Sequence, residues 1–191
     1  MIQEGLVTSK LEPLGEASVV SLAIDTDAYF IGVKEAVNTL ANIKGMKGAY
    51  VTSTRPARAI TNKLLLDGVS LDNIFFIDSI TYSVGGGTGG SDNVVFVESP
   101  AMLETLILKM AWFNRRFKDS KRFILLDSVN TLAVYNEANM LSEFIHILVN
   151  KLRIEEVFTV ILTVGDNIPD QVDSMLRLVC DETINLRKGG V

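Results

Sequence analysis

Five short apolar runs recur along the chain, each rich in β-branched residues and almost free of polar ones. They span residues 18–24, 48–53, 73–80, 122–129 and 157–164. Strands buried on both faces have this character, because helices cover both sides of a parallel sheet. A sixth segment, residues 182–188, alternates apolar and polar positions and is expected to be another strand. The runs therefore predict a mostly parallel central sheet.

Between these runs, apolar residues recur at helical spacing. Four stripes are present: Phe30, Val33, Val37, Leu40 and Ala41; Leu103, Leu106, Ile107, Met110, Phe113 and Phe117; Leu141, Phe144, Ile145, Leu148 and Leu152; and Val172, Met175, Leu176 and Val179. Each stripe is typical of a helix that packs one face onto a sheet. The alternation predicts a three-layer α/β/α domain with right-handed crossovers over residues 18–188, after an N-terminal extension of residues 1–17.

A glycine-rich stretch at residues 83–93 interrupts this alternation, since five of the six residues from 85 to 90 are glycine. A phosphate-binding loop runs from a strand directly into a helix and usually carries a lysine. This stretch has no lysine and lies between two β-prone pieces, residues 81–82 and 94–98. We therefore interpret it as the loop of a hairpin between two strands.

Composition narrows the class of protein. The chain has 191 residues, 48% of them hydrophobic, which suits one domain with a sizeable core. Its 18 Lys and Arg against 23 Asp and Glu give a net charge of −5, which argues against a nucleic-acid partner. The single cysteine, Cys180, excludes an intrachain disulfide and fits a reducing compartment. Because no apolar run approaches the ~18 residues that span a bilayer, we expect a cytoplasmic protein without a membrane partner.

Acids and hydroxyl residues gather where the predicted strands end. In an open parallel sheet, ligands bind beyond the carboxyl ends of the strands. The candidate residues at this edge are Asp25, Asp27, Thr54, Arg55, Asp78, Asp127, Ser128 and Asp166. Taken singly, such residues are common helix caps and turn formers, whereas several at one edge also suit magnesium or phosphate.

One alternative is a magnesium-dependent phosphatase. Asp25 and Asp27, directly after the first strand, match the D-x-D motif of haloacid-dehalogenase-type phosphatases, in which the first Asp attacks phosphorus and the second is the general acid. Asp166 or Asp170 would then help to bind the metal. The aromatic residues that follow the motif depart from that family, and the hypothesis requires these carboxylates to converge on one ion.

A second pattern covers residues 18 to about 186. The segments 48–81, 94–106, 122–137, 144–153 and 157–164 resemble, in order and spacing, those of the KaiC-like archaeal ATPase group, which has a RecA fold. The run RFILLDS resembles a Walker B strand, with Asp127 at the magnesium-facing position and Ser128 beside it. The resemblance implies a RecA-like domain of the P-loop NTPase superfamily, with the first strand beside the strand that ends at Asp127.

The chain departs from that group where the phosphates should bind. A P-loop needs glycines for close backbone approach, a lysine for the terminal phosphates and a hydroxyl for magnesium. No glycine occurs between Gly15 and Gly32, and Tyr29 or Phe30 falls where the Lys-Thr pair is expected. The Walker A motif is therefore degenerate.

Two further departures concern charge and catalysis. Asp25 and Asp27 place negative charge where a triphosphate would sit, which opposes its binding by energies on the order of kcal/mol in a partly buried site. Thr54 and Arg55 stand where the KaiC-like group usually has a catalytic glutamate. We expect no catalytic residues and no metal, and ATP with Mg²⁺ would bind only in an unconventional pose.

These departures lead to a functional hypothesis of a pseudo-ATPase that acts as a regulatory or signalling module. Its partner would be another protein or a second copy of the chain. Leu108 and Trp112 form a second apolar stripe on the helix that begins near Leu103. Packing on one sheet face does not need that stripe, so it is covered either by the glycine-rich hairpin or by another chain.

Overall fold

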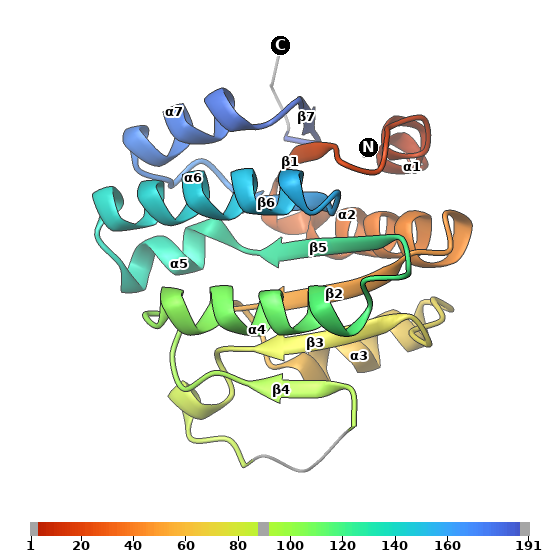
Figure 1. Cartoon of the computed structure of the whole chain (residues 1–191), viewed down its shortest axis with the longest axis horizontal. Helices are drawn as coiled ribbons and strands as arrows, with labels where there is room; N and C mark the ends of the chain where they lie inside the picture. Colours follow the sequence, from red (N-terminus) through yellow and green to blue (C-terminus); the bar gives the residue numbers. More distant parts are fainter. Residues whose placement is uncertain (1–3, 88–91, 188–191) are drawn as a thin grey trace.

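The apolar runs form the strands of a single seven-stranded sheet. The computed structural model describes residues 4–87 and 92–187. Its strands are β1 (Val19–Ile24), β2 (Lys47–Thr52), β3 (Ile74–Asp78), β4 (Val94–Phe96), β5 (Arg122–Asp127), β6 (Phe158–Val164) and β7 (Glu182–Asn185). Every neighbouring pair is parallel, and the order across the sheet is β4-β3-β2-β5-β6-β1-β7 (Figure 1). The α/β fold with a parallel central sheet is thus confirmed.

Helices cover both faces of this sheet. They are α1 (Leu6–Leu11), α2 (Tyr29–Val37), α3 (Ala57–Leu66), α4 (Leu103–Arg116), α5 (Val129–Tyr135), α6 (Ala138–Ile154) and α7 (Asp170–Val179). A π-helical turn, Asn38–Ile43, continues α2, and short 3₁₀ turns lie at Thr26–Ala28 and Tyr82–Val84. Buried residues of α1, α2 and α3 share one hydrophobic cluster, and those of α4 to α7 share the other. None of the helices in the described ranges is long and apolar enough to cross a membrane.

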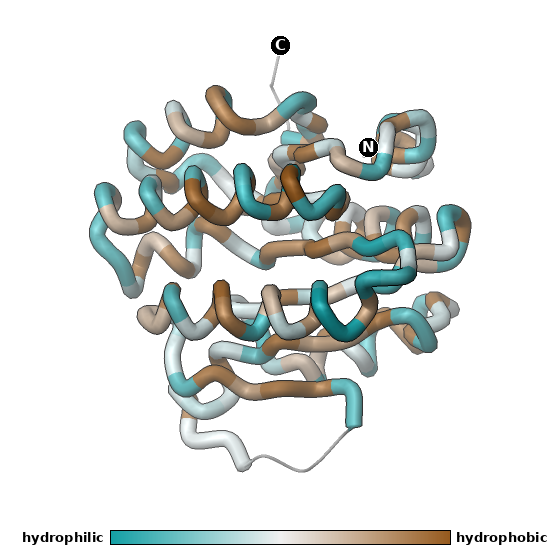
Figure 2. The backbone as a smooth tube through the Cα atoms, in the orientation of Figure 1, coloured by the Kyte–Doolittle hydropathy of each residue, from teal (hydrophilic) through white to brown (hydrophobic). Residues whose placement is uncertain are grey.

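Alternate strand residues supply the two clusters. In β2, Tyr50 faces the α1–α3 side, whereas Ala49 and Val51 face the α4–α7 side. Because both faces are covered, the strands are hydrophobic along most of their length, as Figure 2 shows for β3 and β4. Gly48 is needed where β2 passes β5, since a Cβ atom there would lie 2.2 Å from the ring of Phe123.

The glycine-rich stretch does not form the expected hairpin. Tyr82–Val84 is a 3₁₀ turn rather than a strand, and β4 runs parallel to β3. The turn forms because the Asp78 carboxylate accepts the backbone N–H groups of Ile80 and Thr81, which bends the chain away from the strand direction. The described part of the stretch, residues 83–87 and 92–93, then leads into the amino end of β4; residues 88–91 lie outside the described residues.

The prediction that the first strand lies beside the strand ending at Asp127 is also wrong. β1 pairs with β6 and β7, and β6 pairs on its other side with β5, so β6 separates β1 from the strand that ends at Asp127. β6 is buried along nearly all of its length, and its backbone bonds on both edges, which is what a central strand requires.

The short helix α1, which precedes β1, packs onto the same core as α2. Val7 and Leu11 of α1 are buried in the same cluster as the core residues of α2. The carboxylate of Glu35 on α2 accepts the N–H groups of Gly5 at 2.7 Å, Val7 at 2.9 Å and Thr8 at 3.3 Å. One side chain thus satisfies three backbone donors at the start of α1.

Candidate functional site

Asp127 is the buried centre of the carboxyl edge of the sheet. It is the last residue of β5, the middle strand, and its Oδ2 atom accepts hydrogen bonds from the hydroxyls of Tyr29 and Tyr50, the latter at 2.7 Å. Its Oδ1 atom accepts a third from the Thr54 hydroxyl at 3.2 Å. Both carboxylate oxygens therefore have partners within the protein.

Three different elements bring these hydroxyls to Asp127. Tyr29 is the first residue of α2, Tyr50 lies inside β2, and Thr54 follows the end of β2. Since Thr52 pairs with Asp127 in the β2–β5 ladder, Tyr50 sits one side-chain repeat below the edge on the same strand face as Thr52. Its side chain extends toward the carboxyl edge of the sheet, where the phenol hydroxyl donates to the Asp127 carboxylate.

Burial governs the protonation of this cluster. Burial raises the pKa of Asp127 above its ordinary value, although the hydroxyls of Tyr29, Tyr50 and Thr54 oppose that rise. The pKa of Tyr29 and that of Tyr50 are raised as well, by burial first and then by the neighbouring Asp127 charge. Both phenols therefore remain protonated at neutral pH and can serve as donors.

Arg55 closes the cluster on its solvent side. Its guanidinium carbon lies 5.5 Å from the ring centre of Tyr29 and 5.3 Å from that of Phe30, distances typical of cation–π contacts. The backbone carbonyl of Arg55 accepts the Thr52 hydroxyl at 2.5 Å, which fixes the turn that follows β2. The exposed Arg55 thus places its positive charge over two aromatic rings beside the buried cluster.

Ser128 has a structural role beside Asp127. Its hydroxyl is the N-cap of α5, accepting the N–H of Thr131, and it lies 3.3 Å from the Thr54 hydroxyl. The Ser53 hydroxyl donates to the Asp127 carbonyl at 3.0 Å, and the peptide bond between Asp127 and Ser128 is cis. Asp127 and Ser128 are therefore held in place by hydrogen bonds from the end of the neighbouring strand β2.

Asp78, at the end of β3, is buried and serves as a cap. One of its oxygens accepts the N–H of Ala57 at 2.7 Å, at the start of α3, and the Thr81 hydroxyl at 2.7 Å. The other accepts the two N–H groups of the turn after β3. A carboxylate at a helix N-terminus is stabilised by the helix dipole, so these contacts account for the position of Asp78.

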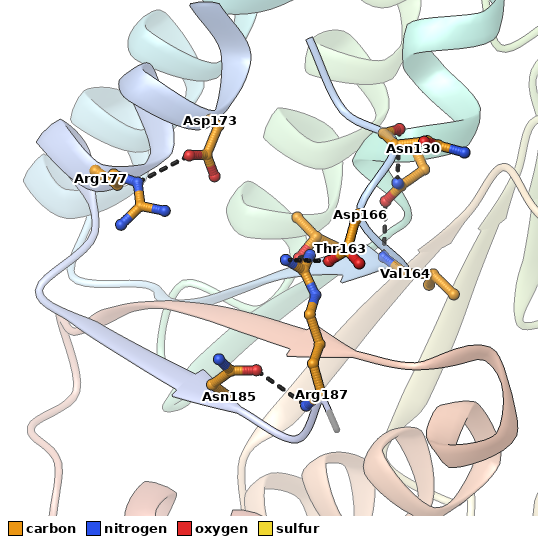
Figure 3. A network of polar contacts seen from close by, with 9 residues as sticks. Asn130, Thr163, Val164, Asp166, Asp173, Arg177, Asn185 and Arg187 are labelled. Carbon is orange, nitrogen blue, oxygen red and sulfur yellow. Dashed lines mark hydrogen bonds and ion pairs between the residues drawn. The ribbon is translucent and has the colours of Figure 1, made fainter. Parts of the chain in front are cut away.

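The remaining predicted acids lie in the loops that follow β1 and β6. Asp25 and Asp27 belong to the turn after β1, where the Asp25 carbonyl accepts the Ala28 N–H at 2.9 Å. Asp166, in the loop after β6, is exposed and lies 3.2 Å from the guanidinium of Arg187 (Figure 3). Arg187 also donates to the Thr163 hydroxyl at 3.0 Å, so its contacts tie the segment after β7 to the end of β6.

These acids do not make the metal site that a phosphatase requires. Across residues 4–87 and 92–187, no three His, Cys, Asp or Glu side chains are grouped so that they could hold a metal ion. That range includes Asp25, Asp27, Asp166 and Asp170, the four carboxylates that the phosphatase alternative needs.

Leu108 and Trp112 lie on α4 but differ in burial. The Trp112 ring is half-buried, 5.2 Å from the ring centre of Phe75 in β3, with the guanidinium of Arg116 5.3 Å from its own centre. Leu108 is 65% exposed and borders, with Trp112 and Val95, a hollow of about 450 Å³. The two residues thus differ, because only Leu108 presents most of its surface to solvent.

The sequence predicts Asp127 as a site residue but not the residues that surround it. Tyr29 stands out in the sequence only because it falls where the Lys-Thr pair is expected, and no motif includes Tyr50 or Arg187. The one available signal for Tyr50 was a phenol within an otherwise apolar strand, since a buried Tyr hydroxyl usually finds a hydrogen-bond partner. Which carboxylate it would meet depended on the strand order.

Comparison with known proteins supports the fold. No protein-family model matches this sequence, and no curated protein does either. Among solved structures, the chain is similar to a KaiC-like protein from the hyperthermophilic archaeon Pyrococcus horikoshii, with a TM-score of 0.62 and 14% sequence identity. The match covers 92% of this chain and 74% of that one. The chain therefore has the RecA-like α/β fold of a KaiC-like protein.

Proposed function

We propose that this chain is a P-loop-NTPase-related domain that does not hydrolyse nucleotide and acts as a regulatory or signalling module by binding protein. The observation that carries the proposal is the state of Asp127, whose oxygens accept three intramolecular hydroxyls in a buried setting. Magnesium is usually bound through one or two carboxylates, ordered water and the phosphates of the substrate. Here two phenols already donate hydrogen bonds to Oδ2 of that carboxylate.

The turn after β1 supports the same proposal. A phosphate cradle presents several successive backbone N–H groups to the anion. Residues 25–28 instead form a tight 3₁₀ turn, in which the Ala28 N–H is bonded to the Asp25 carbonyl. The turn contains two acids and no glycine, so both its hydrogen bonding and its charge oppose a polyphosphate.

The binding role is supported by apolar side chains that the fold leaves exposed on its helices. Leu108 on α4 is an example, beside a hollow whose rim includes Lys109. Exposed apolar surface bordered by polar groups is typical of protein interaction sites. Leu108 and Trp112 are accordingly the proposed contact residues of α4.

A thermal-shift panel tests whether nucleotide binds. The purified protein is heated with ATP, ADP or GTP, each with and without Mg²⁺, at millimolar concentration, while released phosphate is measured in parallel. A ligand at a hundred times its Kd stabilises the folded state by about 2.7 kcal/mol, or about 5 to 11 °C in Tm for a chain of this size. We expect no shift of that size and no phosphate release.

Asp127→Asn is the matched control, because it removes the carboxylate that a magnesium–nucleotide site would need while preserving the shape of the side chain. A Mg²⁺-dependent shift that disappears in this variant, or phosphate release that does so, would contradict the proposal. A shift that is unchanged in the variant and independent of Mg²⁺ identifies binding elsewhere on the surface, and leaves this edge of the sheet inactive.

A further inference from the structure

Helix α6 exposes a line of apolar side chains on the face that points away from the sheet. Met140 is 57% exposed, Ile147 48% and Ile154 84%. They are spaced seven residues apart, so they lie nearly in one line along the helix. We propose that this face pairs with the same face of a second copy of the chain, with the two α6 helices antiparallel.

The packing of α6 on its own sheet does not need this line. The opposite face of the helix already supplies the core, through Leu141, Ile145, Leu148, Val149 and Leu152, all buried in the cluster of α4 to α7. Figure 1 shows α6 on the outside of the molecule, in front of β6. Exposed apolar side chains bordered by polar ones on an outer helix are typical of an interaction surface.

The shape of the face also suits a helix. A hollow of about 440 Å³ lies along it, bordered by His146, Ile147, Asn150, Lys151, Ile154 and Glu155. Four of these, Ile147, Asn150, Lys151 and Ile154, have the i, i+3, i+4, i+7 spacing of a hole that receives a side chain from a facing helix. The hollow therefore leaves room for a facing helix along this side of α6.

The charged residues on this face favour a second copy of the chain as the partner, with the two helices antiparallel. Glu143 and Lys151 stand four residues before and four residues after Ile147. When two α6 helices cross antiparallel at Ile147, each Glu143 lies at the level of the other copy's Lys151, and each Met140 at the level of the other copy's Ile154. A parallel pair would instead bring like charges together, which is unfavourable. The face is therefore complementary to itself, as a two-fold interface requires.

This inference deepens the proposed function by naming a partner, and rests only on its protein-binding part. Sedimentation equilibrium of the full chain, over about 1 to 200 μM protein, measures the dimer dissociation constant. Ile147→Glu places a charge at the centre of the face and is expected to raise that constant by about tenfold or more. Leu66→Glu is the matched control, because Leu66 is 84% exposed on α3, which covers the other side of the sheet.

A charge exchange distinguishes self-pairing from other uses of the face. Glu143→Lys and Lys151→Glu should each weaken the dimer, and the double variant should recover most of the wild-type affinity, because both pairs of opposite charges are restored. The inference is overturned if the wild-type protein is a monomer throughout the concentration range, or if Ile147→Glu leaves the dimer dissociation constant unchanged. It is also overturned if the double variant dimerises no more tightly than the weaker of the two single variants. Circular dichroism confirms that each variant is folded, and the nucleotide panel decides the catalytic question separately.

Discussion

The hydroxyls of Tyr29 and Tyr50 both donate to one buried oxygen of Asp127, and the Thr54 hydroxyl donates to the other. A buried carboxylate without partners costs several kcal/mol, while a hydrogen bond to a charged group contributes about 1.5–3 kcal/mol. Three such bonds offset much of the cost of burial but leave the pKa of Asp127 raised. The carboxylate is therefore held by the structure rather than presented to a ligand.

Asp127→Asn should change how stability depends on pH. Because the pKa of Asp127 is higher in the folded state than in the unfolded state, the folded state binds its proton more tightly. The wild type then loses free energy of unfolding as pH rises from below about 4 through the folded pKa. Asn still offers an oxygen to both phenols and does not ionise, so it should lack this loss. Urea unfolding at a series of pH values measures the difference.

Asp119→Asn is the control for that experiment, since it removes an exposed carboxylate from the turn before β5. Its free energy of unfolding should follow the wild-type pH dependence. If the free energy of unfolding of Asp127→Asn depends on pH in the same way as that of the wild type, then ionising Asp127 does not destabilise the folded state.

Gly48→Ala tests the close approach of β2 to β5. An added Cβ would lie 2.2 Å and 2.4 Å from two ring atoms of Phe123, so the ring would have to move within a packed core. We expect a loss of about 1–3 kcal/mol in the free energy of unfolding, the range for overpacked cores. Gly15→Ala is the control, because the nearest atom to its Cβ would be 3.9 Å away. Equal stabilities for the two variants would contradict this account.

Among the elements, the long periodic helices and continuous apolar runs were predictable from sequence, whereas the short ones were not. α2, α4, α6 and α7 begin within a few residues of their predicted stripes. α5 and β4 have seven and three residues, too few for a periodic pattern to be distinctive. β4 was expected in a hairpin because the sequence does not show that Asp78 would bend the chain after β3.

α1 illustrates a short element that depends on its neighbours. Isolated helices of fewer than about 12 residues are marginal in water, and α1 has six. Glu35→Ala should remove the acceptor for three of its N–H groups, and so expose residues 5–11 to amide hydrogen exchange. We expect faster exchange there by about tenfold, with β5 and β6 unchanged. Lys34→Ala, on the same helix, is the control; similar exchange in both variants would show that Glu35 does not hold α1.

At the scale of the whole molecule, the class of fold followed from the sequence but the order of strands did not. Hydrophobic runs show that a strand is buried, yet they do not show which strands are its neighbours. The position of β6 between β1 and β5 therefore came only from the structure. The same limit applied to the candidate site, because the meeting of Tyr29, Tyr50 and Asp127 joins residues that are up to 98 positions apart.

Tyr29 and Tyr50 belong to separate elements, α2 and β2, and this determines what would be needed to engineer a nucleotide site into the domain. Replacing residues 25–30 with a glycine-rich turn that carries a lysine would remove Tyr29. Tyr50, within β2, would still donate its hydrogen bond to Asp127. Trimming Tyr50 as well would hollow out the centre of the sheet, at a penalty of several kcal/mol. Neither change would suffice by itself, so building an ATP site here requires two coordinated changes and a repacked core.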